Sequence, residues 1–496
     1  KVTESYLFLY LCLFVYVLYT LAMSYPRGIL PVLIILLIVT SELVNGFMKL
    51  NLNHLKLKLD GSKVDLSTVE TKYIEQPLDH FDSSEKRTLK MRYFERLDLW
   101  QPDGPIYVFI GGEGETDETW IAIDKYTLIG QMATDTNGYL LATEHRYYGK
   151  SKPDIPNDNK TEYYKFLSSR QALADIALLI QSIKSDPRYK SSKVVVVGGS
   201  YAGNLAVWLR ELYPDLVDAA VAASAPVLAQ KDFKEYLEGV TYTYGKYGTE
   251  NCLNNIEAYF KRYETLLQSP DGIETLKREL NICPSNDLTV LENKQTLFVS
   301  LYYHLAGYAQ FGRPEQIKKS CKLYEPRDKL TVDLNLGKRA RPDPLSQDCL
   351  NVDFNSIHFT DSWTYQYCTE FGYLLTTTAD KQPFVHWQPL NYTLQYCKYL
   401  IKEDIEKRVD DGVAKTNKMY GGKHPNVTKV VFTNGDMDPW HALGVLQDLG
   451  PDAPATMVNG TSHCAVLLEH DRYDPEELKK NRKFVKELIK KWISSP

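Results

Sequence analysis

The residues of this chain that most clearly suggest chemistry are those around a serine that could act as a nucleophile. Four valines at 194–197 predict a buried strand, and two glycines end that strand directly before Ser200. A helix is expected over 204–212. A serine on so tight a strand-to-helix turn presents its hydroxyl, and it needs small residues two positions before and after, where Gly198 and Ala202 stand. The alternative is a glycine-rich turn that only packs.

A serine nucleophile requires a histidine that accepts its proton and a carboxylate that orients the histidine. Both residue types follow Ser200 along the chain, each after a short predicted strand, in the order Ser, Asp, His. We predict His463 as the general base and Asp438 as the orienting carboxylate, because a proline stiffens the loop directly after Asp438. Asp436 is the alternative carboxylate, and His441 is the alternative histidine.

The oxyanion of an acyl-transfer intermediate needs backbone donors. The N–H of Tyr201 is one candidate, and Gly112, in the loop after a strand expected over 106–110, is the other. Glu113 in the same loop would hold a substrate ammonium group if the enzyme worked from the N-terminus. A nucleotide site is excluded, because the loop lacks the lysine of a P-loop and its glutamates would repel phosphate.

The elements that must position these residues alternate as strand and helix, which predicts a mostly parallel sheet. The fold class expected is α/β, with an α/β-hydrolase sheet. A helix over 171–184 repeats apolar residues at the spacing of a packed surface helix, and another is expected after Asp474. The strands are expected at 106–110, 139–143, 194–197, 219–223, 429–433 and 456–458.

A long insertion separates the two parts of this sheet. Strand signals fade between 229 and 423, and six of the eight cysteines lie there. We therefore expect a mainly helical, disulfide-stapled cap at 229–423, between core segments at 47–228 and 424–496. Sequence alone allows fifteen pairings of the six cysteines. Cys464 lies outside this set of six. We interpret it as a buried free thiol, and the alternative is a nucleophile beside His463.

The N-terminal region has the pattern of a secretory leader. An apolar run behind Met23 and Arg27 ends in small residues near Gly46, which predicts a signal peptide at 23–46 within a leader at 1–46. The competing interpretation is a membrane anchor, which the shortness of the run disfavours. Secretion agrees with glycosylation sequons at Asn159, Asn391, Asn426 and Asn459. A secreted or lysosomal location is expected.

Taken together, the motifs resemble the serine carboxypeptidase family of lysosomal Pro-Xaa carboxypeptidase, which also includes a lysosomal dipeptidyl peptidase and thymus-specific serine protease. The matching pieces span most of the chain, in order: 76–81, 104–106, 111–114, Glu144-His-Arg-Tyr-Tyr-Gly-Lys-Ser151, 171–175, Gly198-Gly-Ser-Tyr-Ala-Gly203, 223–226, 363–366, 368–370, Asn434-Gly, Asp438-Pro-Trp440 and His463.

The resemblance implies an enzyme that cleaves short peptides after proline, from one chain end, with a triad at Ser200, Asp438 and His463. It also implies the disulfides Cys252–Cys321, Cys283–Cys349 and Cys368–Cys397. Asn204 stands where proline-cleaving members carry an apolar residue, which favours the thymus-specific type.

Substrate-binding side chains are expected around the same site. Trp440 neighbours Asp438, and an aromatic face suits a proline ring. Trp363 would line the cap side, with Asn204 and Glu113 as the polar contacts. Core packing is the alternative for both tryptophans.

Charge and composition limit the other functions. The net charge is −5 and no basic patch suits nucleic acid, so no nucleic-acid partner is expected. No cofactor, no metal and no stable membrane anchor are expected, whereas short peptides are the expected partners and a homodimer is compatible with the sequence. The alternatives are an esterase or lipase on the same fold, or a secreted binding protein with a vestigial site.

Overall fold

The computed structural model describes residues 64–326, 349–357, 361–469 and 473–494. These ranges fall within one compact unit, residues 38–496. The predicted signal peptide and leader lie outside the described residues. Among the residues described, no helix is long and apolar enough to cross a membrane.

A single eight-stranded sheet forms the centre of the fold, in the order β1-β2-β4-β3-β5-β6-β9-β10. β2 pairs antiparallel with both β1 and β4, and the remaining pairs are parallel. This order, with one antiparallel strand near the edge, is the α/β-hydrolase arrangement that the sequence predicts. The strands are β1 (Glu70–Pro77), β2 (Thr88–Arg96), β3 (Ile106–Phe109), β4 (Tyr139–Thr143), β5 (Val194–Gly199), β6 (Ala219–Ala223), β9 (Val430–Gly435) and β10 (Ala455–Val458).

Both faces of the sheet are buried, because successive residues of a strand point to opposite faces. On β5, Val194 and Val196 belong to one hydrophobic cluster, whereas Val195 and Val197 belong to the other. Burial on both sides explains why the central strands are continuous runs of valine and alanine rather than alternating patterns.

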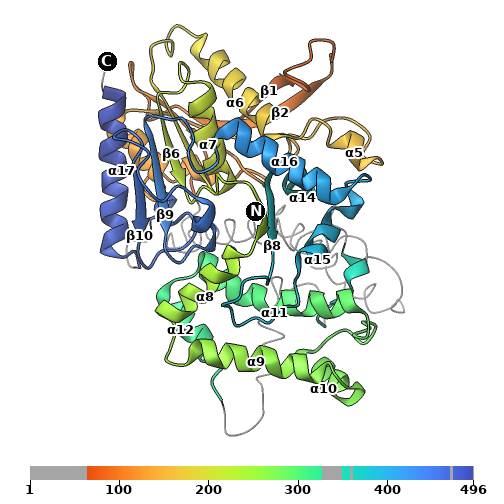
Figure 1. Cartoon of the computed structure of the whole chain (residues 1–496). Helices are drawn as coiled ribbons and strands as arrows, with labels where there is room; N and C mark the ends of the chain where they lie inside the picture. Colours follow the sequence, from red (N-terminus) through yellow and green to blue (C-terminus); the bar gives the residue numbers. More distant parts are fainter. Residues whose placement is uncertain (1–63, 327–348, 358–360, 470–472, 495–496) are drawn as a thin grey trace, which may run out of the picture. The chain divides into compact units, whose positions relative to one another are not determined.

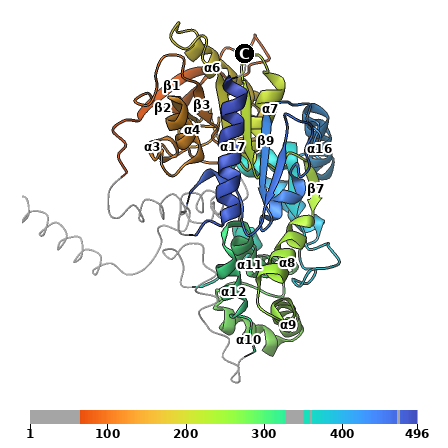
Figure 2. The ribbon, with the colours of Figure 1, turned by 90° about the vertical axis from the view of Figure 1, so that its left-hand side faces the viewer.

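Helices cover the two faces. The first cluster contains residues of α6 (Ser169–Lys184) and α7 (Tyr201–Leu212), and the second contains residues of α4 (Leu128–Thr136) and α17 (Glu476–Ser494). Figure 2 shows α17 in front of the sheet, with α4 on the same side. The shorter helices of the core are α3 (Thr119–Ala122), α5 (Lys160–Tyr163), η4 (Pro439–Leu443) and η5 (Ala465–Leu467).

The insertion between β6 and β9 is mainly helical (Figure 1). Its only described sheet is the two-stranded pair β7 (Gln230–Phe233) and β8 (Gly372–Leu375). The helices are α8 (Glu235–Tyr247), α9 (Cys252–Leu266), α10 (Pro270–Leu280), α11 (Leu291–Phe311), α12 (Pro314–Cys321), η1 (Phe354–Ser356), α14 (Ser362–Gln366), η2 (Tyr367–Phe371), α15 (Leu390–Leu394), η3 (Gln395–Tyr399) and α16 (Ile405–Tyr420).

Three disulfides staple this insertion, with the pairing that the family resemblance implies. They join Cys252 to Cys321, Cys283 to Cys349 and Cys368 to Cys397. Among the described cysteines, Cys464 is free. Loops of 69, 66 and 29 residues are thereby closed, which lowers the entropy of the unfolded chain.

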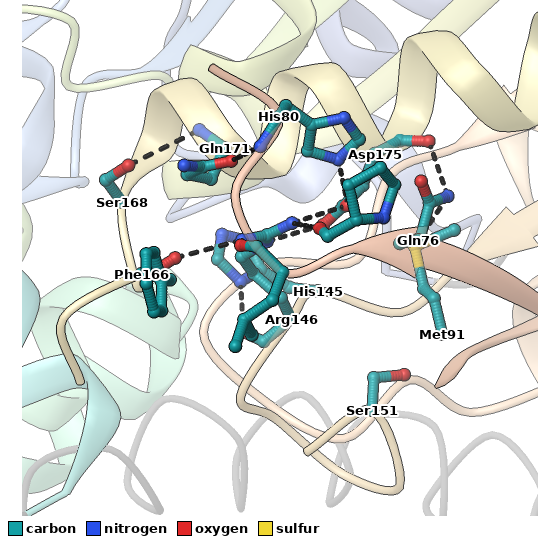
Figure 3. A network of polar contacts seen from close by, with 12 residues as sticks. Gln76, His80, Met91, His145, Arg146, Ser151, Phe166, Ser168, Gln171 and Asp175 are labelled. Atoms are coloured by element: carbon teal, nitrogen blue, oxygen red, sulfur yellow. Dashed lines mark hydrogen bonds and ion pairs between the residues drawn. The ribbon is translucent and has the colours of Figure 1, made fainter. Parts of the chain in front are cut away.

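A buried ion pair fixes the loop that follows β4 (Figure 3). Arg146 Nε donates to Asp175 Oδ2 at 2.6 Å, and its other N–H groups reach Asp175 Oδ1 and three backbone carbonyl oxygens, one of them that of Phe166. His80 Nε2 also contacts Asp175 Oδ1, at 2.7 Å. Because every guanidinium donor has an acceptor, this loop and its histidine, His145, are held firmly against α6.

The structure differs from the predicted elements mainly at their ends and at the sheet edge. α7 begins at Tyr201 rather than at residue 204, because the elbow leads into the helix without an intervening loop. The edge strands β1 and β2, and the pair β7 and β8, were not predicted. β1 shows mostly exposed and half-exposed residues, so it lacks the continuous apolar run that identifies the central strands.

Candidate active site

Ser200 lies on the turn between β5 and α7 with backbone angles φ 57° and ψ −132°. This left-handed conformation is strained for a serine, and such strain persists only where the surrounding structure enforces it. The Ser200 N–H donates to the carbonyl oxygen of Ala223 at 2.9 Å. A Cβ atom on Gly198 would lie 2.0 Å from the carbonyl oxygen of Ala202, so a residue without a side chain is required there. The turn therefore has the geometry of a nucleophile elbow.

Asp438 and His463 meet because they follow neighbouring parallel strands. β9 and β10 pair in parallel with Gly435 opposite Val458, so the loops after them emerge at the same edge of the sheet. His463 Nδ1 lies 2.8 Å from Asp438 Oδ2, and both side chains are almost completely buried.

The alternative carboxylate has other partners. Asp436 Oδ2 accepts hydrogen bonds from Tyr247 at 2.6 Å and from Lys246 at 2.8 Å, and Asp436 Oδ1 accepts one from the N–H of Gly460 at 2.7 Å. These contacts fix the turn before His463. Asp436 therefore supports the loop, whereas Asp438 contacts the imidazole.

The charge of Asp438 makes His463 a stronger base. Burial lowers the pKa of His463, but the charge of Asp438 and the hydrogen bond to it outweigh burial and raise the pKa well above its usual value. Since Nδ1 donates to Asp438, Nε2 is the nitrogen that can exchange a proton with another group. Nε2 is buried and has no hydrogen-bond partner.

The elbow and the histidine loop adjoin at the carbonyl oxygen of Ala223. This oxygen accepts the N–H of Ser200 at 2.9 Å and lies 3.6 Å from Cys464 Sγ. A Cβ atom on Gly199 would lie 2.9 Å from the same sulfur. The residues directly before Ser200 and directly after His463 are thus in contact, although they are far apart in sequence.

The loop after β3 packs against the start of α7. A Cβ atom on Gly112 would lie 3.4 Å from the backbone nitrogen and the methyl group of Ala202. The first N–H groups of α7 have no partner inside the helix. Gly112 thus lies beside the residue that follows Tyr201, and the role of both as oxyanion donors stays a prediction.

Glu113, next to Gly112, is a buried carboxyl group whose pKa is affected by the charge of His463. Burial raises the pKa of Glu113, while its own backbone N–H and the positive charge of His463 act in the opposite direction. Burial is the main cause that raises the pKa of Tyr201 and of Tyr373, and the charge of Glu113 adds to it. Glu113 therefore lies among the predicted site residues.

The tryptophans predicted to bind substrate belong to one aromatic cluster that joins core and insertion. The ring of Tyr373 lies 6.4 Å from that of Trp363 and 5.4 Å from that of Trp440. Trp363 also lies 5.5 Å from the ring of Tyr201, the residue after the elbow serine. Asn204 is fully buried, and its Nδ2 donates to the carbonyl oxygen of Pro226 at 3.1 Å and to the Tyr373 hydroxyl at 3.3 Å.

The Tyr201 side chain is held from two sides. Burial lowers the pKa of His145 to about 4, so the ring is neutral. Its Nδ1 donates to the carbonyl oxygen of Arg146, and its Nε2 therefore accepts the Tyr201 hydroxyl at 3.0 Å. Gln366 Nε2 of α14 donates to the same hydroxyl at 2.9 Å. The insertion thus contacts the elbow directly.

The four glycosylation candidates are all exposed: Asn159, Asn391, Asn426 and Asn459. The Asn459 side chain also accepts from Lys246 Nζ at 3.1 Å. Their glycosylation stays a prediction.

Comparison with known proteins agrees with this geometry. The model of the family described as serine carboxypeptidase S28 matches residues 76–485. The chain belongs to this family. It is therefore a serine peptidase. Thymus-specific serine protease of Mus musculus is 32% identical over 450 residues, which cover 85% of this chain and 87% of that protein.

Lysosomal Pro-X carboxypeptidase of Mus musculus is 29% identical over 449 residues, which cover 85% of this chain and 88% of that protein. Among solved structures, proline iminopeptidase of Mycobacterium smegmatis matches with a TM-score of 0.36 and 12% identity, over 85% of this chain and 99% of that one. The fold assignment rests on the strand order described above.

Several residues at the site were not singled out from the sequence. Tyr373 links the two tryptophans, His145 supports Tyr201, and Gln310 and Tyr236 lie beside the histidine and aspartate loops. Three of the four are on elements of the insertion, where no strand pattern or short motif indicates which side chains face the core.

Proposed function

We propose that the protein is a serine exopeptidase that hydrolyses short peptides, after proline, through a triad of Ser200, His463 and Asp438. The observation that carries this proposal is the buried pair of His463 and Asp438, in which Nδ1 and Oδ2 lie 2.8 Å apart. His463 Nε2 has no hydrogen-bond partner, and the loop that carries His463 contacts the strained turn at Ser200. Two of the relatives, a serine protease and a Pro-X carboxypeptidase, support the same class.

In the proposed reaction, Ser200 Oγ forms a bond to the scissile carbonyl carbon while His463 Nε2 takes its proton. The N–H groups of Tyr201 and Gly112 would stabilise the oxyanion. His463 then gives the proton to the departing amine as the C–N bond breaks. A water molecule reverses the sequence: its oxygen bonds to the acyl carbon, its proton passes through His463 to Ser200, and the acid is released.

Proline preference is proposed from the aromatic cluster. Trp440, Tyr373 and Trp363 offer faces against which a proline ring can pack, since aromatic side chains bury large apolar areas at defined geometries.

We also propose a secreted or lysosomal location, supported by three disulfides, which persist in oxidising compartments. The boundaries of the cap at 229 and 423 remain a proposal, as do short peptides as the partners.

The test uses the purified chain at pH 5 and a Ser200→Ala control. A fluorophosphonate should label the wild-type chain and leave the variant unlabelled. Two matched peptides, one with Xaa-Pro at its N-terminus and one with Pro-Xaa at its C-terminus, then report the cleavage. Absence of labelling would favour the binding-protein alternative, and equal turnover of a lipid ester would favour the esterase alternative.

A further inference from the structure

The first helix of the insertion, α8, lies along the loop that carries Asp438. Gly239, Thr243 and Tyr247 follow one another on α8 at intervals of four residues. Residues spaced by four project from the same side of a helix. One face of α8 is therefore turned toward the end of β9 and the start of η4, where each of these three residues makes a contact.

The helix meets this loop on both sides of Asp438. After Asp438, a Cβ atom on Gly239 would lie 2.9 Å from Pro439 Cα, so the two backbones pack closely. Before Asp438, the Thr243 hydroxyl donates to the carbonyl oxygen of Met437 at 3.1 Å, and both residues are fully buried. The residues directly before and after the predicted catalytic carboxylate are thus held by α8.

Asp436 joins the same helix to the loop that carries His463. Its Oδ2 accepts hydrogen bonds from the Tyr247 hydroxyl at 2.6 Å and from Lys246 Nζ at 2.8 Å, both on α8. Its Oδ1 accepts the N–H of Gly460 at 2.7 Å, on the loop after β10. Asp436 is only 5% exposed, and hydrogen bonds to an ionised carboxylate are stronger than those between neutral groups.

The two catalytic loops are also bonded to each other beside Asp436. The N–H of Met437 donates to the carbonyl oxygen of Thr461 at 3.0 Å. Gly460 has a φ of 70°, in the left-handed region that glycine adopts without steric cost. The carboxylate of Asp436 therefore holds a tight turn that lies three residues before His463.

The ion pair with Lys246 does not by itself account for this arrangement. The Lys246 side chain is 38% exposed, and ion pairs at a surface contribute little to stability. The buried bonds of Asp436 instead connect three segments, which are α8 and the loops that carry Asp438 and His463. The 2.8 Å contact between those two residues orients the imidazole, and a displacement of about 1 Å in a catalytic group can lower a rate by about 10²-fold.

We propose that Asp436 is a positioning residue, through which α8 of the insertion holds the loops of Asp438 and His463 in the register that their contact requires. The inference rests on the proposed triad. It makes the insertion part of the structure that assembles the triad, in addition to a cover over the sheet.

The experiment separates the speed of the reaction from the amount of folded protein. Fluorophosphonate labelling at pH 5 gives a rate constant and, at its end point, the labelled fraction. Asp436→Ala should lower the rate constant by about 10²-fold without lowering the end-point fraction. Asp436→Asn retains one acceptor oxygen and should restore part of the rate. For the peptide that the wild type cleaves, kcat should fall while KM stays unchanged.

Two further variants serve as controls. Tyr247→Phe keeps the aromatic ring but removes one donor to Asp436, so it should fold and should lower the rate constant in the same direction by a smaller factor. Glu279→Gln breaks the ion pair of Arg262 with Glu279, which joins α9 to α10 away from β9 and β10 (Figures 1 and 2). It should leave the rate constant unchanged.

A second measurement reports the pair without using activity. The proton that His463 Nδ1 donates to Asp438 should give a low-field signal in the proton NMR spectrum, because the acceptor is a buried carboxylate. The signal is assigned by its absence in His463→Gln. In Asp436→Ala it should move to higher field or disappear through exchange with water, whereas in Glu279→Gln it should stay in place.

A wild-type rate constant in Asp436→Ala and Tyr247→Phe, or a loss confined to the end-point fraction, would overturn the inference and leave the proposed peptidase function intact. Absence of labelling in the wild type would reject the proposed reaction, and the NMR signal would then decide the positioning role. A signal that depends on Asp436 would support this role, and one that is the same in Asp436→Ala would overturn it.

Discussion

Glu370 should make the protein more stable in acid than at neutral pH. This carboxyl group on η2 accepts hydrogen bonds from the Ser169 N–H at 3.0 Å and the Ser169 hydroxyl at 2.8 Å, and so joins the insertion to the first turn of α6. Burial raises its pKa to about 7, against the opposing effects of Ser169, Gln366 and the positive charge of Lys415. The folded protein therefore binds a proton at Glu370 more tightly than the unfolded chain does.

The size of the effect follows from the two pKa values. The unfolded carboxyl has its ordinary pKa of 4.5 and the folded one a pKa of about 7. At about 1.4 kcal/mol for each pH unit, this difference corresponds to about 3 kcal/mol of folding free energy. Because the folded pKa is the higher one, the stabilisation is complete below pH 4.5 and is lost as the pH rises to 7.

Glu370→Gln provides the matched perturbation, because glutamine keeps an acceptor for Ser169 and resembles the protonated acid. Urea unfolding of both proteins should give similar free energies at pH 4.5. At pH 7.5 the variant should be the more stable one, by up to about 3 kcal/mol. If the difference between the two proteins is the same at both pH values, the carboxyl is ionised throughout and the reasoning fails.

Three further predictions concern the site itself. Asp438→Asn should keep the fold but lower kcat by about 10³- to 10⁴-fold, because the imidazole loses the charge that orients it; a kcat near that of the wild type would show that Asp438 does not orient His463. Gly198→Ala should prevent accumulation of folded protein, because its Cβ would lie 2.0 Å from the Ala202 carbonyl oxygen, and normal expression with an unchanged melting temperature would contradict the elbow geometry. Glu113→Gln should leave KM for peptides with a free N-terminus unchanged if the enzyme works from the C-terminus, whereas a raised KM for Xaa-Pro peptides would assign Glu113 to a substrate ammonium group.

Much of the core was predictable because its signals are local. The run of valines before Ser200 identifies β5, and the small residues around the serine identify the turn, since both depend on the conformations of a few neighbouring residues. The pairing of His463 with Asp438 was predictable for a related reason: two short strands that each end in a polar loop place those loops at one edge of a parallel sheet.

The insertion was predictable in class but not in detail. Its six cysteines and helical spacing indicate a stapled helical segment, yet the pairing came from the family resemblance rather than from spacing. Residues 295–299 of α11 are all buried, so helical periodicity does not single out one face of this helix, and it does not say that the helix ends on the histidine loop. Contacts such as that of Gln310 with His463 join residues about 150 positions apart, and no local rule encodes them.

The sequence alone therefore determined the nucleophile turn, the order of the three predicted catalytic residues and the strands that carry them, because each depends on neighbouring residues and on the short connections of a parallel sheet. The tertiary structure alone decided which aromatic rings meet Trp440 and that the end of α11 packs on His463. These features depend on packing between the insertion and the core, and packing is set by the whole arrangement of helices rather than by any segment of the chain.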